Sequence, residues 1–302
     1  MDKKTGPWMG TAVTLGTAVL ATIIGARLRP KQRATSPETA VPGSYALITG
    51  ASSGIGEAFA RRLAQQGYNL VLVARRQAKL AALADELGRE YGVAAEVLAA
   101  DLAQMDDVAR VEQRIHALDL AVLVNNAGFG TNRGSLLASD LDEQMNMLNL
   151  HVQATMRLCR AALPGMTAHG RGDIINVSSI AAFFPSPGDT NYAASKAYMN
   201  AFSQALQAEV AGQGIRVQAL CPGFTHTEFH ATPAMTGFQK SRVPAKLWMT
   251  PEQVAEYSLR CLGRNQVICV PGFYNQLLVL GAQNGLAGLV LRVARRLRHR
   301  GR

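Results

Sequence analysis

The chain has 302 residues, enough for one large domain or two small ones with a substantial core. Hydrophobic residues make up 48% and charged residues 17%, a balance that excludes a disordered chain. The net charge of +10 would suit nucleic acid, but residues 27–33 and 292–302 hold four and six basic residues without an acid, which accounts for the whole excess. Because basic runs beside apolar segments are typical of membrane flanks, we expect no nucleic-acid partner.

The N-terminus reads as a separate segment. No charge occurs from Thr5 to Ala26, and the apolar run Trp8 to Leu28 is about as long as a bilayer-spanning helix. A secretory signal is the alternative, although no clear cleavage site follows, and a segment lying in the membrane interface is another. We favour a membrane anchor at residues 1–29, followed by a linker at 30–43. The heavier basic flank after the segment predicts that the domain that follows it lies on the cytoplasmic side.

From Ser44 onward the pattern becomes α/β. A short apolar strand, Tyr45–Thr49, precedes a glycine-rich turn and a helical run over residues 57–66. Such a turn lets the backbone approach a pyrophosphate, which the N-terminus of the following helix attracts. The candidate cofactor-binding residues of this turn are Gly50, Ser52, Ser53, Gly54, Ile55 and Gly56.

The second strand, Asn69–Ala74, ends at Arg75. An acidic residue at this place would bind the ribose 2′-hydroxyl of NAD, whereas an arginine suits a 2′-phosphate. Ser52 and Ser53 would add hydroxyl donors. The pattern therefore favours NADP(H) over NAD(H), with Arg75 as the residue that contacts the phosphate.

The alternation of strands and helices continues along the chain. The spacing predicts helices over Gln77–Tyr91 and Gln104–Ala117 and strands over Ala94–Ala99 and Leu120–Val124. This pattern predicts a doubly wound parallel sheet, a Rossmann fold with helices on both faces. Ligands of such sheets bind at the carboxyl ends of the strands, where Asp101 and the turn at 125–128 are expected.

Tyr192 and Lys196 are four residues apart, which on a helix places a phenol and an ammonium on one face. A fixed cation beside a phenol favours the phenolate, so the pair would serve as a proton donor for a carbonyl oxygen. A strand over Asp173–Ser178 would deliver Ser178 and Ser179 to the same sheet edge.

These motifs together resemble the short-chain dehydrogenase/reductases, in their form with a single catalytic domain. The resemblance covers about Tyr45 to Pro271 and rests on TGASSGIG at 49–56, NNAG at 125–128, INVSS at 175–179, YAASK at 192–196 and PG at 222–223.

The resemblance implies residue roles as well as a fold. Asn149, Ser179, Tyr192 and Lys196 would be catalytic. Ser179 is chosen over Ser178 because it precedes Tyr192 by thirteen residues, the spacing of the family, and it would hold the substrate oxygen. Asn149, within a helical run expected over residues 140–163, would hold a water. Asp101 and Leu102 would contact the adenine, and Asn126, Ala127 and Gly128 would line the adenosine-side cleft. Pro222, Gly223, Thr225 and Thr227 would approach the nicotinamide, and Tyr192 and Lys196 would contact the cofactor as well.

The stretch after Gly223 is rich in aromatic and methionine residues, which suits a lid over a hydrophobic substrate or small helices packed on the domain. His226 and His230 flank Glu228, but the acid is misplaced for a zinc motif, and the four cysteines lack metal spacing, so no metal is expected. The cysteines are expected to be reduced thiols. Thr250 followed by proline predicts a helix start, and residues 266–270 predict a last strand.

Residues 273–302 form an apolar stretch followed by a basic amphipathic one. This tail suits a membrane surface, or alternatively a helix that closes the substrate pocket or forms a dimer contact. The sequence thus predicts a membrane-associated, NADP(H)-dependent oxidoreductase that interconverts a ketone or aldehyde and an alcohol on an apolar, lipid-like small molecule. The alternative is a non-catalytic dinucleotide-binding sensor or scaffold. The resemblance also implies a homodimer or homotetramer.

Overall fold

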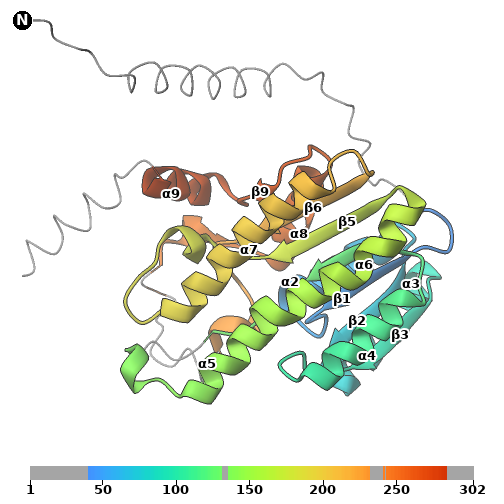
Figure 1. Cartoon of the computed structure of the whole chain (residues 1–302), viewed down its shortest axis with the longest axis horizontal. Helices are drawn as coiled ribbons and strands as arrows, with labels where there is room; N and C mark the ends of the chain where they lie inside the picture. The colour runs from blue at the N-terminus through green and yellow to red at the C-terminus, as the bar shows by residue number, and fades with distance from the viewer. Residues whose placement is uncertain (1–39, 131–134, 232–240, 242, 284–302) are drawn as a thin grey trace, which may run out of the picture. The chain divides into compact units, whose positions relative to one another are not determined.

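The computed structural model describes residues 40–130, 135–231, 241 and 243–283 (Figure 1). Its centre is a seven-stranded parallel sheet in the order β3-β2-β1-β4-β5-β6-β9. The strands are β1 (Tyr45–Thr49), β2 (Asn69–Ala74), β3 (Ala95–Ala99), β4 (Leu120–Asn125), β5 (Gly172–Val177), β6 (Ile215–Leu220) and β9 (Ile268–Cys269). The doubly wound Rossmann fold is therefore confirmed.

Helices cover both faces of this sheet. The long helices are α2 (Gly54–Gln65), α3 (Gln77–Tyr91), α4 (Met105–His116), α6 (Thr155–His169), α7 (Thr190–Glu209) and α8 (Pro251–Leu262). One buried cluster joins the sheet to α2, α3 and α8, and a second joins it to α4, α6 and α7. The five inner strands, β2, β1, β4, β5 and β6, are largely buried because the parallel sheet lies between two helical layers, whereas the edge strand β3 is only partly buried.

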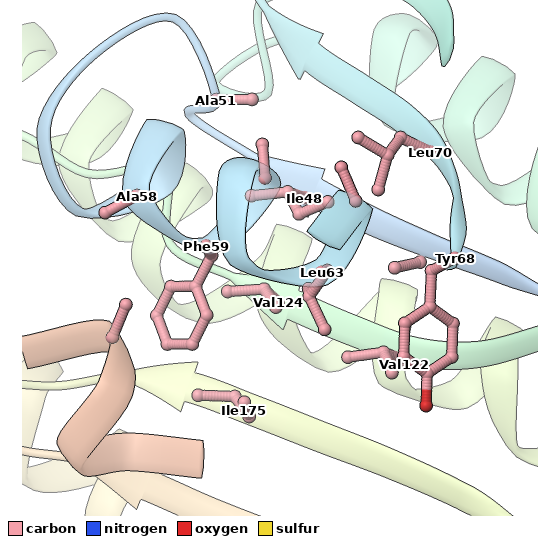
Figure 2. Close-up of a cluster of buried hydrophobic side chains, with 14 of the residues drawn as sticks. Ile48, Ala51, Ala58, Phe59, Leu63, Tyr68, Leu70, Val122, Val124 and Ile175 are labelled. Carbon is pink, nitrogen blue, oxygen red and sulfur yellow. The ribbon is translucent and has the colours of Figure 1, made fainter. Parts of the chain in front are cut away.

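Phe59 of α2 lies near the middle of the first cluster and is fully buried. It lies among Ile48 of β1, Val124 of β4 and Ile175 of β5 (Figure 2). These neighbours come from three adjacent strands. Packing of one large ring across three strands fixes the start of α2 above the carboxyl ends of β1 and β4, where the glycine-rich turn lies.

The remaining described elements are short, and most lie around that edge. They are η1 (Leu136–Ala138), α5 (Leu141–Leu148), η2 (Asn149–Ala154), η3 (Ile180–Phe183), β7 (Phe224–Thr225), η4 (Glu228–Ala231), η7 (Ala245–Leu247), β8 (Trp248–Met249) and α9 (Phe273–Gln283). The expected helix start at Thr250 is present as a capping box with Gln253.

Three local features differ from the sequence analysis. The helix after the glycine turn begins at Gly54 rather than at residue 57, and β6 was not identified from the sequence. The helical run expected over 140–163 is divided, because a π-helical turn begins at Asn149. Single π turns inside helices are frequent at functional sites.

The predicted anchor at 1–29, most of the linker and the basic part of the tail lie outside the described residues. Of the linker, Ala40 is tied to the domain by a hydrogen bond from its N–H to the Gln66 carbonyl oxygen. Within the ranges that the structure describes, no helix combines the length and apolar character needed to cross a bilayer.

Candidate active site

The glycine-rich turn lies between β1 and β4, where the strand order of the sheet reverses. Gly50 and Gly54 have φ values of +67° and +61°, which side chains other than hydrogen disfavour. A methyl group on Gly56 would overlap the Gly50 carbonyl oxygen. The turn therefore needs these glycines, and it places the N-terminus of α2 at the point where open α/β sheets bind ligands.

The turn at 125–128 supports this loop from the side of β4. The Asn126 Nδ2 donates to the Thr49 carbonyl oxygen at 2.9 Å, and the N–H groups of Asn126 and Ala127 both donate to Thr49 Oγ1 at 2.9 Å. Asn126 and Ala127, predicted to line the cofactor cleft, thus also fix the end of β1. Gly128 lies close to Lys196, since a methyl group on it would come within 3.6 Å of the Lys196 Nζ.

The N-terminus of α2 suits an anionic group. Ser53 is the N-cap residue, but its side chain makes no capping hydrogen bond; its hydroxyl accepts one from Arg76 instead. The first-turn N–H groups therefore keep their capacity for a pyrophosphate oxygen. Together with the glycine cradle, this arrangement fits a dinucleotide.

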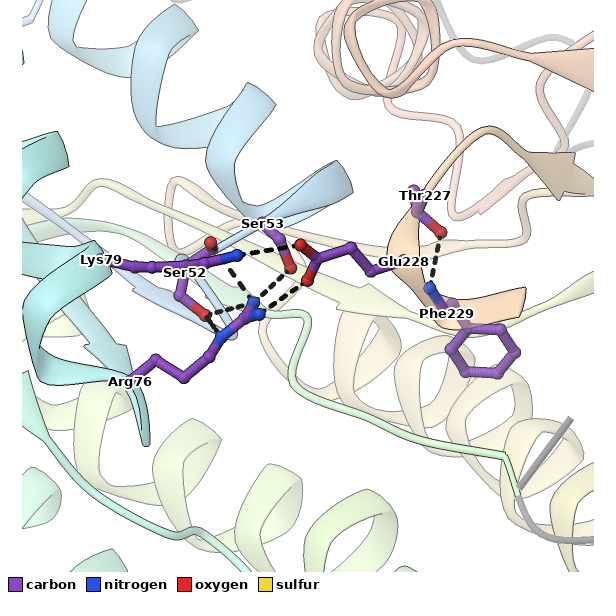
Figure 3. A network of polar contacts seen from close by, with 7 residues as sticks. All are labelled: Ser52, Ser53, Arg76, Lys79, Thr227, Glu228 and Phe229. Atoms are coloured by element: carbon purple, nitrogen blue, oxygen red, sulfur yellow. Dashed lines mark hydrogen bonds and ion pairs between the residues drawn. The ribbon is translucent and has the colours of Figure 1, made fainter. Parts of the chain in front are cut away.

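The basic residue on the serine pair is Arg76 rather than Arg75 (Figure 3). The Arg76 Nη2 lies 2.9 Å from Ser52 Oγ and 2.7 Å from Ser53 Oγ, whereas the Arg75 side chain is 74% exposed and lies 4.0 Å from Asp101. Successive side chains at the end of a strand point to opposite sides, which explains the difference. An adjacent basic pair was the only signal in the sequence that could have indicated Arg76.

Two further charges that the sequence analysis missed complete this cluster. The Glu228 carboxylate accepts from Arg76 Nη1 at 2.7 Å and from Lys79 Nζ at 2.9 Å (Figure 3). These partners are separated by about half the chain, so no local pattern could have joined them.

Lys196 lies on α7 and is only 4% exposed. Its Nζ donates to the Val177 carbonyl oxygen at the end of β5 at 2.9 Å, and it lies 5.7 Å from the centroid of the Tyr192 ring. Burial lowers the pKa of Lys196 to about 8, with a small opposing contribution from Cys221. An ammonium has three donors, so the one strong bond to Val177 leaves donor capacity for a ligand.

The Tyr192 ring packs between His151 and Phe229, with centroid distances of 5.9 and 6.1 Å. His151 is fully buried in the π-helical turn. Its Nε2 accepts the Phe129 N–H at 3.3 Å, which assigns the proton to Nδ1, 3.0 Å from Ser195 Oγ. The Ser195 hydroxyl in turn donates to the Tyr192 carbonyl oxygen at 2.8 Å. His151, which the sequence analysis missed, therefore holds the backbone of the tyrosine.

The two serines after β5 differ in their contacts. Ser178 is buried, and its hydroxyl donates to the Lys196 carbonyl oxygen at 2.8 Å. Ser179 is half-buried, and its oxygen accepts the Ala181 N–H at 3.1 Å as the cap of η3. Ser178 thus secures α7 to the sheet, which leaves Ser179 as the better candidate for a substrate contact. Asn149 starts the π turn, with its Nδ2 3.5 Å from the Ala103 carbonyl oxygen.

The other predicted cofactor residues lie along the same edge. Asp101 accepts the Ala103 N–H at 3.1 Å, Leu102 is buried, and Ile55 packs against the core at the start of α2. The Pro222 carbonyl oxygen accepts the Ile180 N–H at 3.0 Å, which connects the two loops.

Thr225, Thr227 and Gly223 continue that loop. The Thr225 hydroxyl donates to the Gly223 carbonyl oxygen at 3.2 Å, and a methyl group on Gly54 would come within 2.9 Å of Thr227 Cγ2. Gly223 packs directly on buried Asn275 of α9, because a methyl group on it would overlap that side chain at 2.5 Å. The described part of the chain contains no cluster of three or more His, Cys, Asp or Glu residues able to hold a metal ion.

Comparison with known proteins connects this geometry to a family. Residues 44–235 match the family described as short chain dehydrogenase. A 17-beta-hydroxysteroid dehydrogenase type 3 of Danio rerio is 39% identical over 73% of this chain and 70% of its own length. A very-long-chain 3-oxoacyl-CoA reductase of Anas platyrhynchos is 36% identical over 62% of this chain and 61% of its own, so the match spans less than two thirds of that relative.

Solved structures agree with these sequence matches. A short-chain dehydrogenase from Sphingobium yanoikuyae in complex with NADPH superimposes with a TM-score of 0.72 at 34% identity, covering 83% of this chain and 94% of the other. A 7beta-hydroxysteroid dehydrogenase gives a TM-score of 0.73 at 28% identity, covering 80% and 92%. The chain therefore belongs to the short-chain dehydrogenases and is an oxidoreductase with the dinucleotide-binding fold of that family.

Proposed function

We propose that the protein is an NADP(H)-dependent oxidoreductase that interconverts a ketone or aldehyde and an alcohol on an apolar, lipid-like substrate. The observation that carries the proposal is the buried Lys196 ammonium beside the Tyr192 ring. Both residues belong to α7, which packs on β6, and the Lys196 Nζ contacts the Val177 carbonyl oxygen at the end of β5. A buried cation at this place is expensive unless a ligand or a proton transfer uses it.

The roles of the side chains follow from their chemistry. A bound nicotinamide supplies or accepts the hydride. Tyr192 protonates the carbonyl oxygen in reduction and takes the proton from the alcohol in oxidation. Lys196 uses its remaining donors on the ribose hydroxyls, and its charge favours the phenolate. Ser179 holds the substrate oxygen, and Asn149 holds a water that links Lys196 to solvent.

The choice of NADP(H) rests on the cationic cluster at the end of β2. Arg76 and Lys79 provide a guanidinium and an ammonium beside two serine hydroxyls, donors that suit a phosphate monoester. Arg75, which lies toward Asp101, contributes less than the sequence analysis expected. The likeness to a short-chain dehydrogenase in complex with NADPH also supports this choice.

The apolar character of the substrate rests on the elements that follow Ser179. Ile180 and Phe183 of η3 pack against a buried cluster that includes Val279 of α9, and Phe229 lies against Tyr192. This wall offers little polarity for a sugar or an organic acid. The names of the relatives, which refer to steroids and to very-long-chain 3-oxoacyl-CoA, point to the same class of compound.

Membrane association is part of the proposal, with the catalytic domain facing the cytoplasm. Apolar residues of α9 are exposed, among them Phe273 at 66% and Leu280 at 56%. A lipid-like substrate also favours an enzyme at a membrane surface. Deletion of residues 1–33 is expected to release much of the protein from the membrane fraction. A full-length chain that is already soluble would contradict this part of the proposal.

A carbonyl panel tests the activity. The full-length protein is assayed for kcat/KM with NADPH and with NADH on a long-chain 3-oxoacyl thioester, a 17-ketosteroid and a short hydrophilic aldehyde. We expect turnover of at least one bulky apolar ketone, with NADPH preferred by roughly tenfold or more. Absence of turnover on every compound, with tight dinucleotide binding retained, would favour a sensor or scaffold.

A further inference from the structure

The cationic cluster at the end of β2 already holds an anion that belongs to the chain itself. One carboxylate oxygen of Glu228 lies 2.7 Å from Arg76 Nη1 and the other lies 2.9 Å from Lys79 Nζ (Figure 3). A carboxylate that bridges a guanidinium and an ammonium uses the same donors as two oxygens of a phosphate monoester. Glu228 therefore occupies the position that a 2′-phosphate would need.

All three nitrogens of the Arg76 guanidinium have partners in this arrangement. Its Nε and Nη2 are directed to Ser52 and Ser53, and its Nη1 to Glu228. Serine hydroxyls can turn to donate to an incoming phosphate, whereas an ionised carboxylate cannot. Lys79 and Arg76 hold the pKa of Glu228 down to about 2, so the carboxylate stays charged at neutral pH. A phosphate and this carboxylate therefore exclude each other.

The segment that carries Glu228 lies directly on the phosphate-binding turn. The Thr227 side chain fills the space next to Gly54, where a methyl group would approach Thr227 Cγ2 to 2.9 Å. Glu228 thus reaches Arg76 and Lys79 from the segment that follows β7. Its carboxylate meets Arg76 and Lys79 through side-chain contacts, which a bound dinucleotide can replace.

We propose that Glu228 is a specificity-determining residue, an internal anion that occupies the 2′-phosphate subsite of Arg76 and Lys79 until NADP(H) displaces it. This inference rests on the proposed use of NADP(H). The 2′-phosphate regains the two cations that Glu228 gives up, whereas NAD(H) has no group to exchange and leaves the ion pairs in place. The carboxylate therefore lowers the affinity for NADP(H) without a matching effect on NAD(H).

Titration calorimetry of the full chain with NADP⁺ and with NAD⁺ tests this proposal without turnover. Two exposed ion pairs of this kind correspond to roughly three- to tenfold in Kd, so Glu228→Gln should tighten NADP⁺ by that factor. NAD⁺ should change by less than about twofold, because it does not displace the carboxylate. Glu256→Gln is the matched control, since Glu256 forms a similar exposed pair with Arg260 on α8 and should leave both constants unchanged.

A second pair of variants separates the two proposals. In an Arg76→Met background, Glu228→Gln should lose roughly half of its effect on NADP⁺, because only the competition at Lys79 remains. An unchanged or weaker NADP⁺ affinity in Glu228→Gln would overturn the inference, provided that Arg76→Met alone weakens NADP⁺. If Arg76→Met leaves the NADP⁺ affinity unchanged, the cofactor assignment itself fails.

Discussion

Lys196 and Arg76 are cations at the same edge of the sheet, but the protein holds them in opposite ways. Lys196 is 4% exposed and has one strong hydrogen bond, to a backbone carbonyl, whereas the Arg76 side chain is 43% exposed and is shared among two hydroxyls and a carboxylate. Burial acts on the buried cation through desolvation, which lowers its pKa. The exposed cation is governed by the anion that is paired with it. Binding of a ligand through Lys196 should therefore depend on pH, and binding through Arg76 should depend on salt and on the charge of the ligand.

Removal of the Tyr192 hydroxyl, near the buried Lys196, should give the largest effect, a loss of kcat. Tyr192→Phe keeps the ring between His151 and Phe229 but removes the proposed general acid, so kcat should fall by roughly 10²- to 10⁴-fold. The Kd for NADP⁺ should barely change, because Arg76 and Lys79, the proposed contacts of the 2′-phosphate, are unchanged. Tyr198→Phe, on the same helix and stacked on Phe202, is the control and should keep its rate. A Tyr192→Phe enzyme with most of its kcat would refute the assigned role.

Removal of the Arg76 guanidinium should weaken cofactor binding but leave the chemical step unchanged. Arg76→Met should weaken NADP⁺ binding by roughly tenfold, the size expected for a charge-assisted contact to a phosphate, with little change in kcat at saturation. Arg75→Met is the matched variant, because Arg75 is the neighbouring arginine and lies away from the serine pair. The two variants are compared by their dissociation constants for NADP⁺ at low and at high salt. A larger loss for Arg75→Met would restore the assignment made from the sequence.

The pH dependence of cofactor affinity should separate the two cations further. Burial lowers the pKa of Lys196 to about 8, so its ammonium is charged below that pH and neutral above it. In the free enzyme the contact to the ribose hydroxyls should therefore weaken as pH rises through about 8. We expect the Kd for NADP⁺ to rise several-fold, by roughly three- to tenfold, between pH 7 and pH 9. The curve should flatten in Lys196→Met, and an equal slope in both proteins would contradict this account.

The sequence predicted the scaffold better than the charge network, and the reason is the range of the interactions involved. The strands at 45–49, 69–74 and 120–124 are local apolar runs bounded by turns, so their position does not depend on distant residues. The glycine-rich turn and the spacing of Tyr192 and Lys196 are also local, and the fold brings these motifs to one sheet edge. The π-helical turn that interrupts the helix at Asn149 could not be predicted from helix propensity, because the only local signal is one polar residue within a helical run.

The pairing of Glu228 with Arg76 and Lys79 joins segments about 150 residues apart in sequence, at 152 and 149 positions. Such contacts depend on the completed fold and have no periodic pattern. For the same reason, the choice between Arg75 and Arg76 required the direction in which each side chain leaves the end of β2. The roles of the catalytic and cofactor residues remain predictions that the variants above test.

The smallest expected effect concerns His151. It tests directly how burial of this histidine changes the pH dependence of folding stability. Full burial and the nearby Lys196 charge hold its pKa well below 6.5. Below pH 6.5 the unfolded chain binds a proton that the folded chain refuses, so folding stability is complete above that pH and is lost as pH falls. The contribution approaches about 1.4 kcal/mol per pH unit.

Denaturant unfolding of the unchanged protein should therefore show a drop in the free energy of unfolding of about 1 kcal/mol between pH 6.5 and 5.5. His151→Gln should lack this drop, whereas His169→Gln, which changes a half-exposed histidine, should keep it. The comparison uses the change with pH rather than the absolute stability, so any general loss of packing in His151→Gln cancels. Equal pH slopes in the three proteins would mean that His151 accepts a proton in the folded state. The hydrogen bond from Phe129 to Nε2 could not then persist, and the histidine would not be the neutral support on which the position of Tyr192 depends.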